Sequence, residues 1–249
     1  MTNGYATGPS GDPGSYALSD FVPFTAEVYF RLIERFGETS WPWHGPMLVL
    51  GLASVVLIWR GRSRIACALI AIPWAWVGIA FLGQRYAELN WAGSWFAGAF
   101  LVQGGLLLLL AATGAGFDRA GIDRGGFDRG GAARAATHTP WRERSVPRWG
   151  GLILAGFGVI AYPVIAPLSG FGPFQAETFG IHPDPTAVAT LGILLVGLRG
   201  AGLWLALAIP VLWCVVTGLT LQVLGAPWAM VPLAAAMVGV LLAAWKTAR

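Results

Sequence analysis

Charge is scarce in this sequence of 249 residues, because Asp, Glu, Lys and Arg together make up only 11% of it. Soluble globular domains carry about 25% charged residues. Hydrophobic residues account for 56% of the chain, and its mean hydropathy is +0.64. A water-soluble fold of this size cannot bury so much apolar surface, so the bilayer must form part of the solvent. The low charge therefore indicates an integral membrane protein.

Cysteine and recognisable catalytic motifs are equally scarce. The two cysteines, Cys67 and Cys214, both fall inside apolar segments, so no disulfide framework is expected. The sequence contains no phosphate-binding glycine motif, no CxxC and no HExxH. We therefore expect no cofactor and no metal, and enzymatic activity is disfavoured.

Seven apolar runs make up most of the chain. Their bounds are 44–60, 65–84, 91–112, 149–168, 185–198, 202–222 and 228–245. A membrane span needs about 20 residues, so the run 185–198 is clearly short. The sequence predicts an all-α, polytopic transmembrane helical bundle with seven spans, or six if that run does not cross.

The residues before the first run divide into a polar tail and a short amphipathic segment. Residues 1–22 are rich in Gly, Pro and Ser, which is typical of a disordered tail. Within 23–38, apolar residues recur at helical spacing opposite charged ones. Thr25 is positioned to cap this helix and Gly37 to end it. Because the segment is too short and polar to span, we expect an interfacial amphipathic helix with its apolar face toward the membrane.

Basic residues alternate with the runs. If all seven runs cross, thirteen of the sixteen Lys and Arg residues fall on one side, and only Arg31, Arg35 and Arg85 fall on the other. The positive-inside rule then predicts a cytoplasmic C-terminus and an N-terminus outside. Without a crossing at 185–198, Lys246 and Arg249 would move outside, so the pattern favours seven spans over six.

An Arg/Gly-rich loop, predicted to be cytoplasmic, covers 113–148 between the spans of 44–112 and those of 149–245. It contains FDRAGIDRGGFDRGG, three copies of a five-residue unit in which each Arg follows an Asp. A low-complexity linker is favoured over a contact with anionic lipid or RNA, because the Asp cancels most of the attraction. No nucleic-acid partner is expected.

Ionisable residues are missing from the interiors of the seven runs. Such residues mark ion paths and proton relays, so their lack argues against a proton-driven pump and against an enzyme with paired carboxylates. For the few polar side chains that are present, hydrogen bonding between helices is the favoured role. They include Gln103, Thr190, Thr217 and Gln222.

A second polar group is expected at the outer face. Its members are His44, Glu88, Glu177, His182 and Asp184. Their spacing does not support a metal site. Asp184 followed by Pro185 is typical of a helix N-cap and first helical position. The run that follows reaches only about 21 Å against a hydrocarbon core near 30 Å, so the loop before it should be drawn below the membrane surface.

Two function classes fit these features. The first is small-solute transport or binding, with residues 169–185 dipping into the bundle beside an outward-facing cavity. The second is a non-catalytic scaffold or accessory subunit that holds a membrane protein partner through the interfacial helix and the Arg/Gly-rich loop. Both have the lipid bilayer as their surroundings, and the first is favoured.

Several short stretches, taken together, resemble the bacterial integral-membrane family named domain of unknown function 6064. They are PFTAEVYF at 23–30, WP at 41–42, Asn90 with Ala92, Gln103, FG at 179–180, PDPT at 183–186 followed by TLGILL, and IPVLW at 209–213. The resemblance implies a multi-span protein of a bacterial cytoplasmic membrane and no established activity.

The chain departs from that family pattern at three places. Family members usually have Pro-Cys-Pro-Thr where this chain has Asp184 between its prolines, Tyr-His where it has Phe81 and Leu82, and Gln where it has His44. A thiol-based mechanism at the Asp184 position is therefore not expected here, which further weakens an enzymatic interpretation.

Overall fold

The computed structural model describes residues 18–117 and 145–248, and within them the chain is helical with no strand. The prediction of an all-α fold is therefore confirmed. The α-helices are α1 (Ala26–Thr39), α2 (His44–Trp59), α3 (Ser63–Trp76), α4 (Gly93–Thr113), α5 (Ser145–Gly156), α6 (Tyr162–Leu168), α7 (Pro183–Gly197), α8 (Gly200–Val223) and α9 (Met230–Thr247). Short 3-10 or π segments are η2 (Leu18–Phe21), η3 (Val77–Gly83), η4 (Tyr86–Glu88), η7 (Phe157–Ala161) and η8 (Pro173–Gln175).

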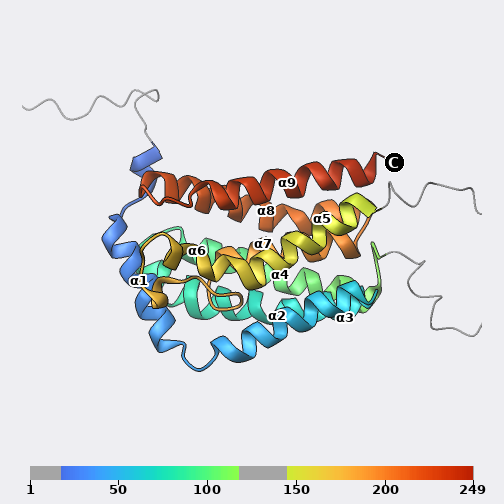
Figure 1. Cartoon of the computed structure of the whole chain (residues 1–249), viewed down its shortest axis with the longest axis horizontal. Coiled ribbons are helices and arrows are strands. Elements are labelled where there is room, and N and C mark those ends of the chain that lie inside the picture. The colour runs from blue at the N-terminus through green and yellow to red at the C-terminus, as the bar shows by residue number, and fades with distance from the viewer. Residues whose placement is uncertain (1–17, 118–144, 249) are drawn as a thin grey trace, which may run out of the picture.

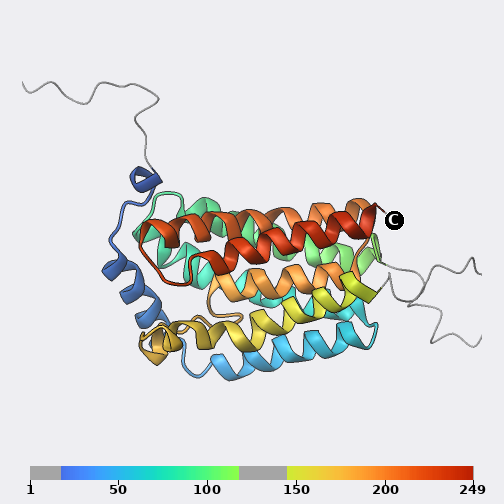
Figure 2. The ribbon, with the colours of Figure 1, turned by 45° about the horizontal axis from the view of Figure 1, so that its top comes forward.

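Helices α2 to α9 run lengthwise between two ends of a bundle, and α1 crosses one of those ends (Figures 1 and 2). We call this the α1 end. The opposite end, which we call the basic end, holds the C-terminus and the turns after α2, α4 and α7 (Figure 1). The tail predicted at 1–22 and the loop predicted at 113–148 lie largely outside the described residues, although 18–21 form η2 and α5 already begins at Ser145.

Five helical stretches are long and apolar enough to cross a membrane. They are Ser63–Glu88, Gly93–Thr113, Val146–Leu168, Gly200–Val223 and Met230–Thr247. A bent pair, Leu18–Thr39 with His44–Trp59, would add a sixth span, but its two parts meet at 93°. Helix α7 has only 15 residues. The length and composition are those of a membrane protein, and the predicted count of seven spans is not confirmed.

Helix α1 begins where the sequence predicts, because the Thr25 side chain accepts a hydrogen bond from the backbone N–H of Val28. It does not end at Gly37, as expected, but continues to Thr39. Gly37 instead allows a close approach, since a Cβ there would lie 2.6 Å from the carbonyl oxygen of Phe174. The buried side chains of α1 pack on the end of the bundle, so its apolar face is covered by protein; an interfacial position stays a prediction.

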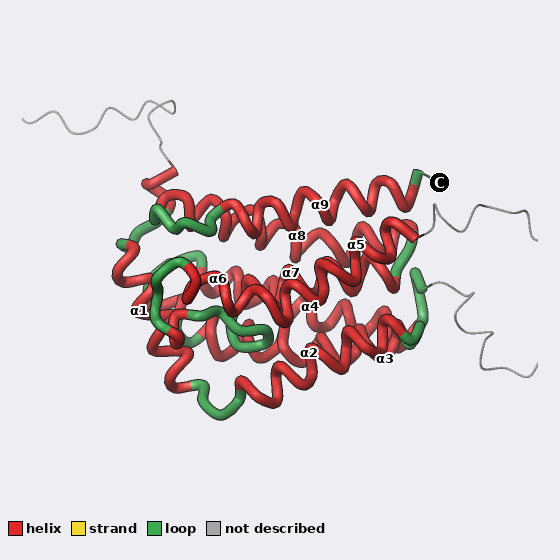
Figure 3. Tube along the Cα trace, viewed as in Figure 1, coloured by secondary structure: helices red, strands yellow, loops and turns green. Residues whose placement is uncertain are grey.

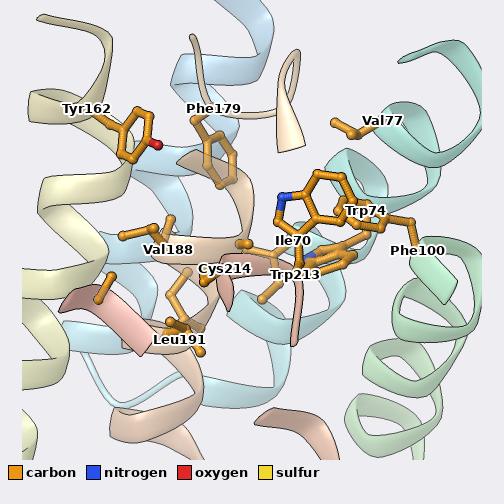
Figure 4. Close-up of a cluster of buried hydrophobic side chains, with 14 of the residues drawn as sticks. Ile70, Trp74, Val77, Phe100, Tyr162, Phe179, Val188, Leu191, Trp213 and Cys214 are labelled. Atoms are coloured by element: carbon orange, nitrogen blue, oxygen red, sulfur yellow. The ribbon is translucent and has the colours of Figure 1, made fainter. Parts of the chain in front are cut away.

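Helix α7 lies at the centre of the bundle, where fourteen of its fifteen residues are buried. It contacts α2, α3, α5, α8 and α9, and Figure 4 shows Val188 and Leu191 pointing into the surrounding core. Small residues allow α5 to approach closely: a Cβ on Gly151 would lie 2.8 Å from the carbonyl oxygen of Gly192. A helix that is apolar on every face requires such an environment.

Three basic side chains at the basic end bind carbonyl groups at helix C-termini. Arg64 donates to the carbonyls of Ala111 and Ala112 in α4, both at 2.7 Å. Lys246 donates to the carbonyls of Leu195 and Leu198 at the end of α7, the second at 2.7 Å. Arg148 does the same for Trp59 of α2, at 3.1 Å. These cations complement the negative ends of the helices, so they have structural partners in addition to any part in topology.

Candidate functional site

The segment between α6 and α7, residues 169–182, folds back into the bundle near the α1 end (Figure 3). Residues 177–182 are all buried. Gly180 makes the turn possible, because its φ is 77° and a Cβ there would lie 2.9 Å from Met47. Its N–H donates to the Thr186 hydroxyl at 2.9 Å, and that hydroxyl donates to the carbonyl of His182 at 2.7 Å. We call residues 169–182 the inward segment.

Asp184 lies at the start of α7, but it does not cap the helix. The sequence suggested Asp184 as the N-cap, whereas the helix begins at Pro183 and His182 takes the cap position without a side-chain hydrogen bond. This prediction is wrong because Pro183, with its fixed φ, already fits the first helical position. The carboxylate of Asp184 is therefore free to bind side chains from other helices.

Three side-chain donors converge on the Asp184 carboxylate, which is fully buried. Trp213 Nε1 donates to Oδ1 at 2.8 Å, and the hydroxyl of Thr217 donates to Oδ2 at 2.9 Å. The hydroxyl of Tyr162 donates to the same Oδ2 at 3.3 Å. Figure 4 shows Tyr162 and Trp213 reaching into the core from different helices. Donors on α6 and α8 thus hold a carboxylate of α7, as expected for a buried charge that requires compensation.

Glu177 is the second buried carboxyl group, with an exposed fraction of 4%. Its Oε2 is buried and has no hydrogen-bond partner. Burial raises the pKa of Glu177 well above its ordinary value, and the charge of Asp184 raises it further. The two carboxyl groups are thus close enough to interact, and a charge on Glu177 is costly in this buried position.

A small hollow adjoins two of the Asp184 donors and has room for about one water molecule. It is lined by Tyr29, Phe81, Tyr86, Trp213, Val216, Thr217 and Thr220. Trp213 and Thr217 therefore contact both the hollow and Asp184, and the hydroxyl of Tyr29 lies beside Thr217. We refer to Asp184, Glu177, Tyr29, Tyr162, Trp213 and Thr217 as the Asp184 cluster.

His182 is fully buried next to this cluster. Its Nδ1 accepts a hydrogen bond from the backbone N–H of Thr178 at 3.0 Å, so the ring proton must sit on Nε2. Nε2 is buried and makes no well-formed hydrogen bond, although the backbone of Ile33 lies within polar range; the ring meets Phe36 and Phe81 edge to face. Burial lowers the pKa of His182 to about 3, which keeps the ring neutral.

The remaining residues singled out from the sequence do not join the cluster. Glu88 is exposed in η4, and His44 lies at the start of α2 within electrostatic range of His182. Gln103 donates to the carbonyl of Ala206 at 3.0 Å, and Thr190 accepts from Trp74 Nε1 at 2.8 Å, which matches the predicted bonding between helices. Gln222 contacts Met230 Sδ.

The structure brings together four of the predicted residues, Glu177, His182, Asp184 and Thr217, and adds three that sequence reasoning missed. Those three are Tyr29, Tyr162 and Trp213, aromatic residues with a polar tip that lie on the apolar face of α1 or inside apolar runs. Such residues usually find a hydrogen-bond partner when buried. Their presence in apolar surroundings is therefore the sequence signal that points to a buried polar site. Within 18–117 and 145–248, no three His, Cys, Asp or Glu side chains gather in a way that could hold a metal ion.

Comparison with other proteins places the chain in a family by sequence. No curated protein and no solved structure matches it. The profile of a family described as being of unknown function, DUF6064, matches residues 26–118 and 140–249, which is most of the chain. The family resemblance seen in the short motifs is therefore confirmed, and the chain belongs to the DUF6064 family.

Proposed function

We propose that this protein binds a small solute within the membrane, in the Asp184 cluster beneath α1. The observation that carries the proposal is a fully buried Asp184 held by three side-chain donors, next to a Glu177 oxygen without a partner. Buried ionisable groups are costly in a membrane protein and commonly mark the path or site of a ligand. Irregular backbone inside a bundle, such as the inward segment, is characteristic of such sites.

Access to the site is proposed from the α1 end. Helix α1 rests on the bundle through aromatic contacts, in which Phe30 lies 4.9 Å from Phe171 and Phe36 lies 5.2 Å from Phe81 between ring centroids. Tyr29 of α1 lines the hollow, so moving α1 outward would open it. With the basic end in the cytoplasm, the site would open to the outside, and transport would further require a path toward the basic end.

Thermal unfolding of the full chain in lipid nanodiscs tests this proposal. A panel of ammonium, urea, glycerol and acetate covers cationic, neutral and anionic small solutes. We expect at least one of them to raise the Tm in a saturable way, because a ligand that binds only the folded state stabilises it. Asp184→Asn should remove that response, whereas Asp20→Asn, at an exposed aspartate, should keep it. No response to any solute would contradict the proposal and favour a scaffold role.

A further inference from the structure

We propose that the ligand of the Asp184 cluster is an ammonium-type cation, meaning ammonium itself or a small protonated amine; this inference rests on the proposed solute-binding function.

The charge of the site favours a cation. Asp184 and Glu177 are both buried, and in the parts of the chain that the structure describes neither takes part in a salt bridge. The ion pairs formed by the described residues include Arg31–Glu34 and Arg35–Glu38, both on α1. A buried carboxylate without a counter-charge is costly even when it is hydrogen-bonded. A monovalent cation would supply the missing positive charge, whereas an anion would be repelled.

The hollow suits a cation about as large as a water molecule. Four of its seven lining residues are aromatic, Tyr29, Phe81, Tyr86 and Trp213. Aromatic faces attract ammonium groups through the ring quadrupole. The N–H groups of an ammonium ion also need acceptors, which the hydroxyls of Thr217 and Thr220 can offer. Glu177, whose Oε2 has no partner, does not line the hollow but lies within electrostatic range of its lining residue Tyr29.

Metal ions fit the same site poorly. Calcium takes six to eight oxygen ligands and magnesium needs a near-octahedral set of them. Asp184 already accepts three hydrogen bonds, so little of its carboxylate is left for coordination. Phe81 and Trp213 offer no oxygen ligand, and among the described residues no three His, Cys, Asp or Glu side chains gather in a way that could hold a metal ion. The lining is thus better matched to nitrogen cations than to divalent metal ions.

The experiment measures Tm for the full chain in nanodiscs at constant ionic strength and constant pH. Ammonium chloride and methylammonium chloride are compared with sodium, potassium and tetramethylammonium chloride. We expect ammonium and methylammonium to raise the Tm by about 3 °C or more at saturation. Sodium and potassium should have little effect on the Tm. Tetramethylammonium should also leave the Tm unchanged, because it is too large for the hollow. Equal shifts with every salt would overturn the inference, since they would reflect ionic screening.

Two variants locate the effect. Glu177→Gln has the same shape without the charge and should weaken the apparent ammonium affinity at least tenfold. Glu88→Gln makes the same change at an exposed carboxylate and should respond like the unaltered chain. An unchanged ammonium response in Glu177→Gln would overturn the assignment. If urea or glycerol raises the Tm while ammonium does not, the cation inference fails and the proposed solute binding stands; if no solute acts, both fail.

Discussion

The two ends of the bundle treat charge in opposite ways. At the basic end, Arg64, Arg148 and Lys246 donate to carbonyl groups that helix termini leave without partners. At the α1 end, Glu177 and His182 are buried with one polar atom each that makes no well-formed hydrogen bond. Only Asp184 is well supplied there, with three donors.

The basic residues at one end have a clear structural role, whereas the buried polar groups at the α1 end do not. A cation at a helix C-terminus satisfies carbonyls and complements the helix dipole, so its contribution is to stability. An unpartnered buried group lowers stability, and proteins tend to keep such groups where function requires them. Substitutions at the two ends should therefore differ in kind as well as in size.

The largest effect is expected at Asp184. Asp184→Ala would leave the N–H of Trp213 and the hydroxyls of Thr217 and Tyr162 without their acceptor in a buried site. We expect a loss of about 3 kcal/mol in unfolding free energy, because unsatisfied buried groups each carry a desolvation cost. Denaturant unfolding in mild detergent micelles measures the loss. Asp184→Asn keeps an oxygen acceptor and should lose less; equal losses would contradict the hydrogen-bond explanation.

At the basic end, Lys246→Met should cost about 1.5 kcal/mol, because it removes a charged donor from the carbonyls of Leu195 and Leu198. The same unfolding measurement applies. Solute binding should be unchanged, since Lys246 contacts the opposite end of α7 from Asp184. A Lys246→Met chain of normal stability that has lost solute binding would reverse the proposed division between the two ends.

His182→Asn should cost about 1 kcal/mol at pH 7, because the smaller side chain leaves a void between Phe36 and Phe81. Asn is chosen because its oxygen can still accept from the N–H of Thr178. The cost should shrink in acid. The pKa of His182 is about 3 when folded against an ordinary 6.5, so the unaltered chain loses stability as pH falls below about 6.5. Unfolding at pH 7 and pH 5 measures the change, and a constant cost would contradict a neutral buried ring.

The smallest effect at pH 7 is expected for Glu177→Gln, which replaces a group that has an unpartnered oxygen. Its stability should lie within about 1 kcal/mol of the unaltered chain. The pH dependence should differ more clearly. Because the pKa of Glu177 is raised, its contribution is complete below about 4.5 and is lost as pH rises through the folded value. A pH series of unfolding curves should therefore show Glu177→Gln gaining on the unaltered chain with rising pH; parallel curves would argue against the raised pKa.

Local sequence signals predicted the helices well and the site only in part. The seven apolar runs correspond to helical segments, and Thr25 caps α1 as its position suggests. The Asp184 cluster joins residues 22, 29 and 33 positions apart in sequence, a relation that no local period contains. Asp before Pro at the start of a helix predicts an N-cap, which is the local role of Asp there. The side chains that bind Asp184 instead lie on other helices, where local sequence does not reveal them.

The apolar runs do lack ionisable residues, but the interior of the bundle does not. Glu177 and Asp184 lie just outside the run 185–198, yet both are buried in the bundle because the inward segment folds in ahead of α7. A short run that is apolar on all sides was the available sign that protein surrounds this helix.

The sequence by itself determined that the chain is helical and suited to a bilayer, where its helices begin and end to within a few residues, and to which family it belongs. Composition and helical periodicity are properties of neighbouring residues, so they can be read locally. The tertiary structure alone decided that α7 is enclosed, that Asp184 binds side chains from α6 and α8, and that α1 covers the cluster. Those outcomes depend on how each helix is rotated and how deeply it sits against its neighbours, which is set by packing across the whole bundle.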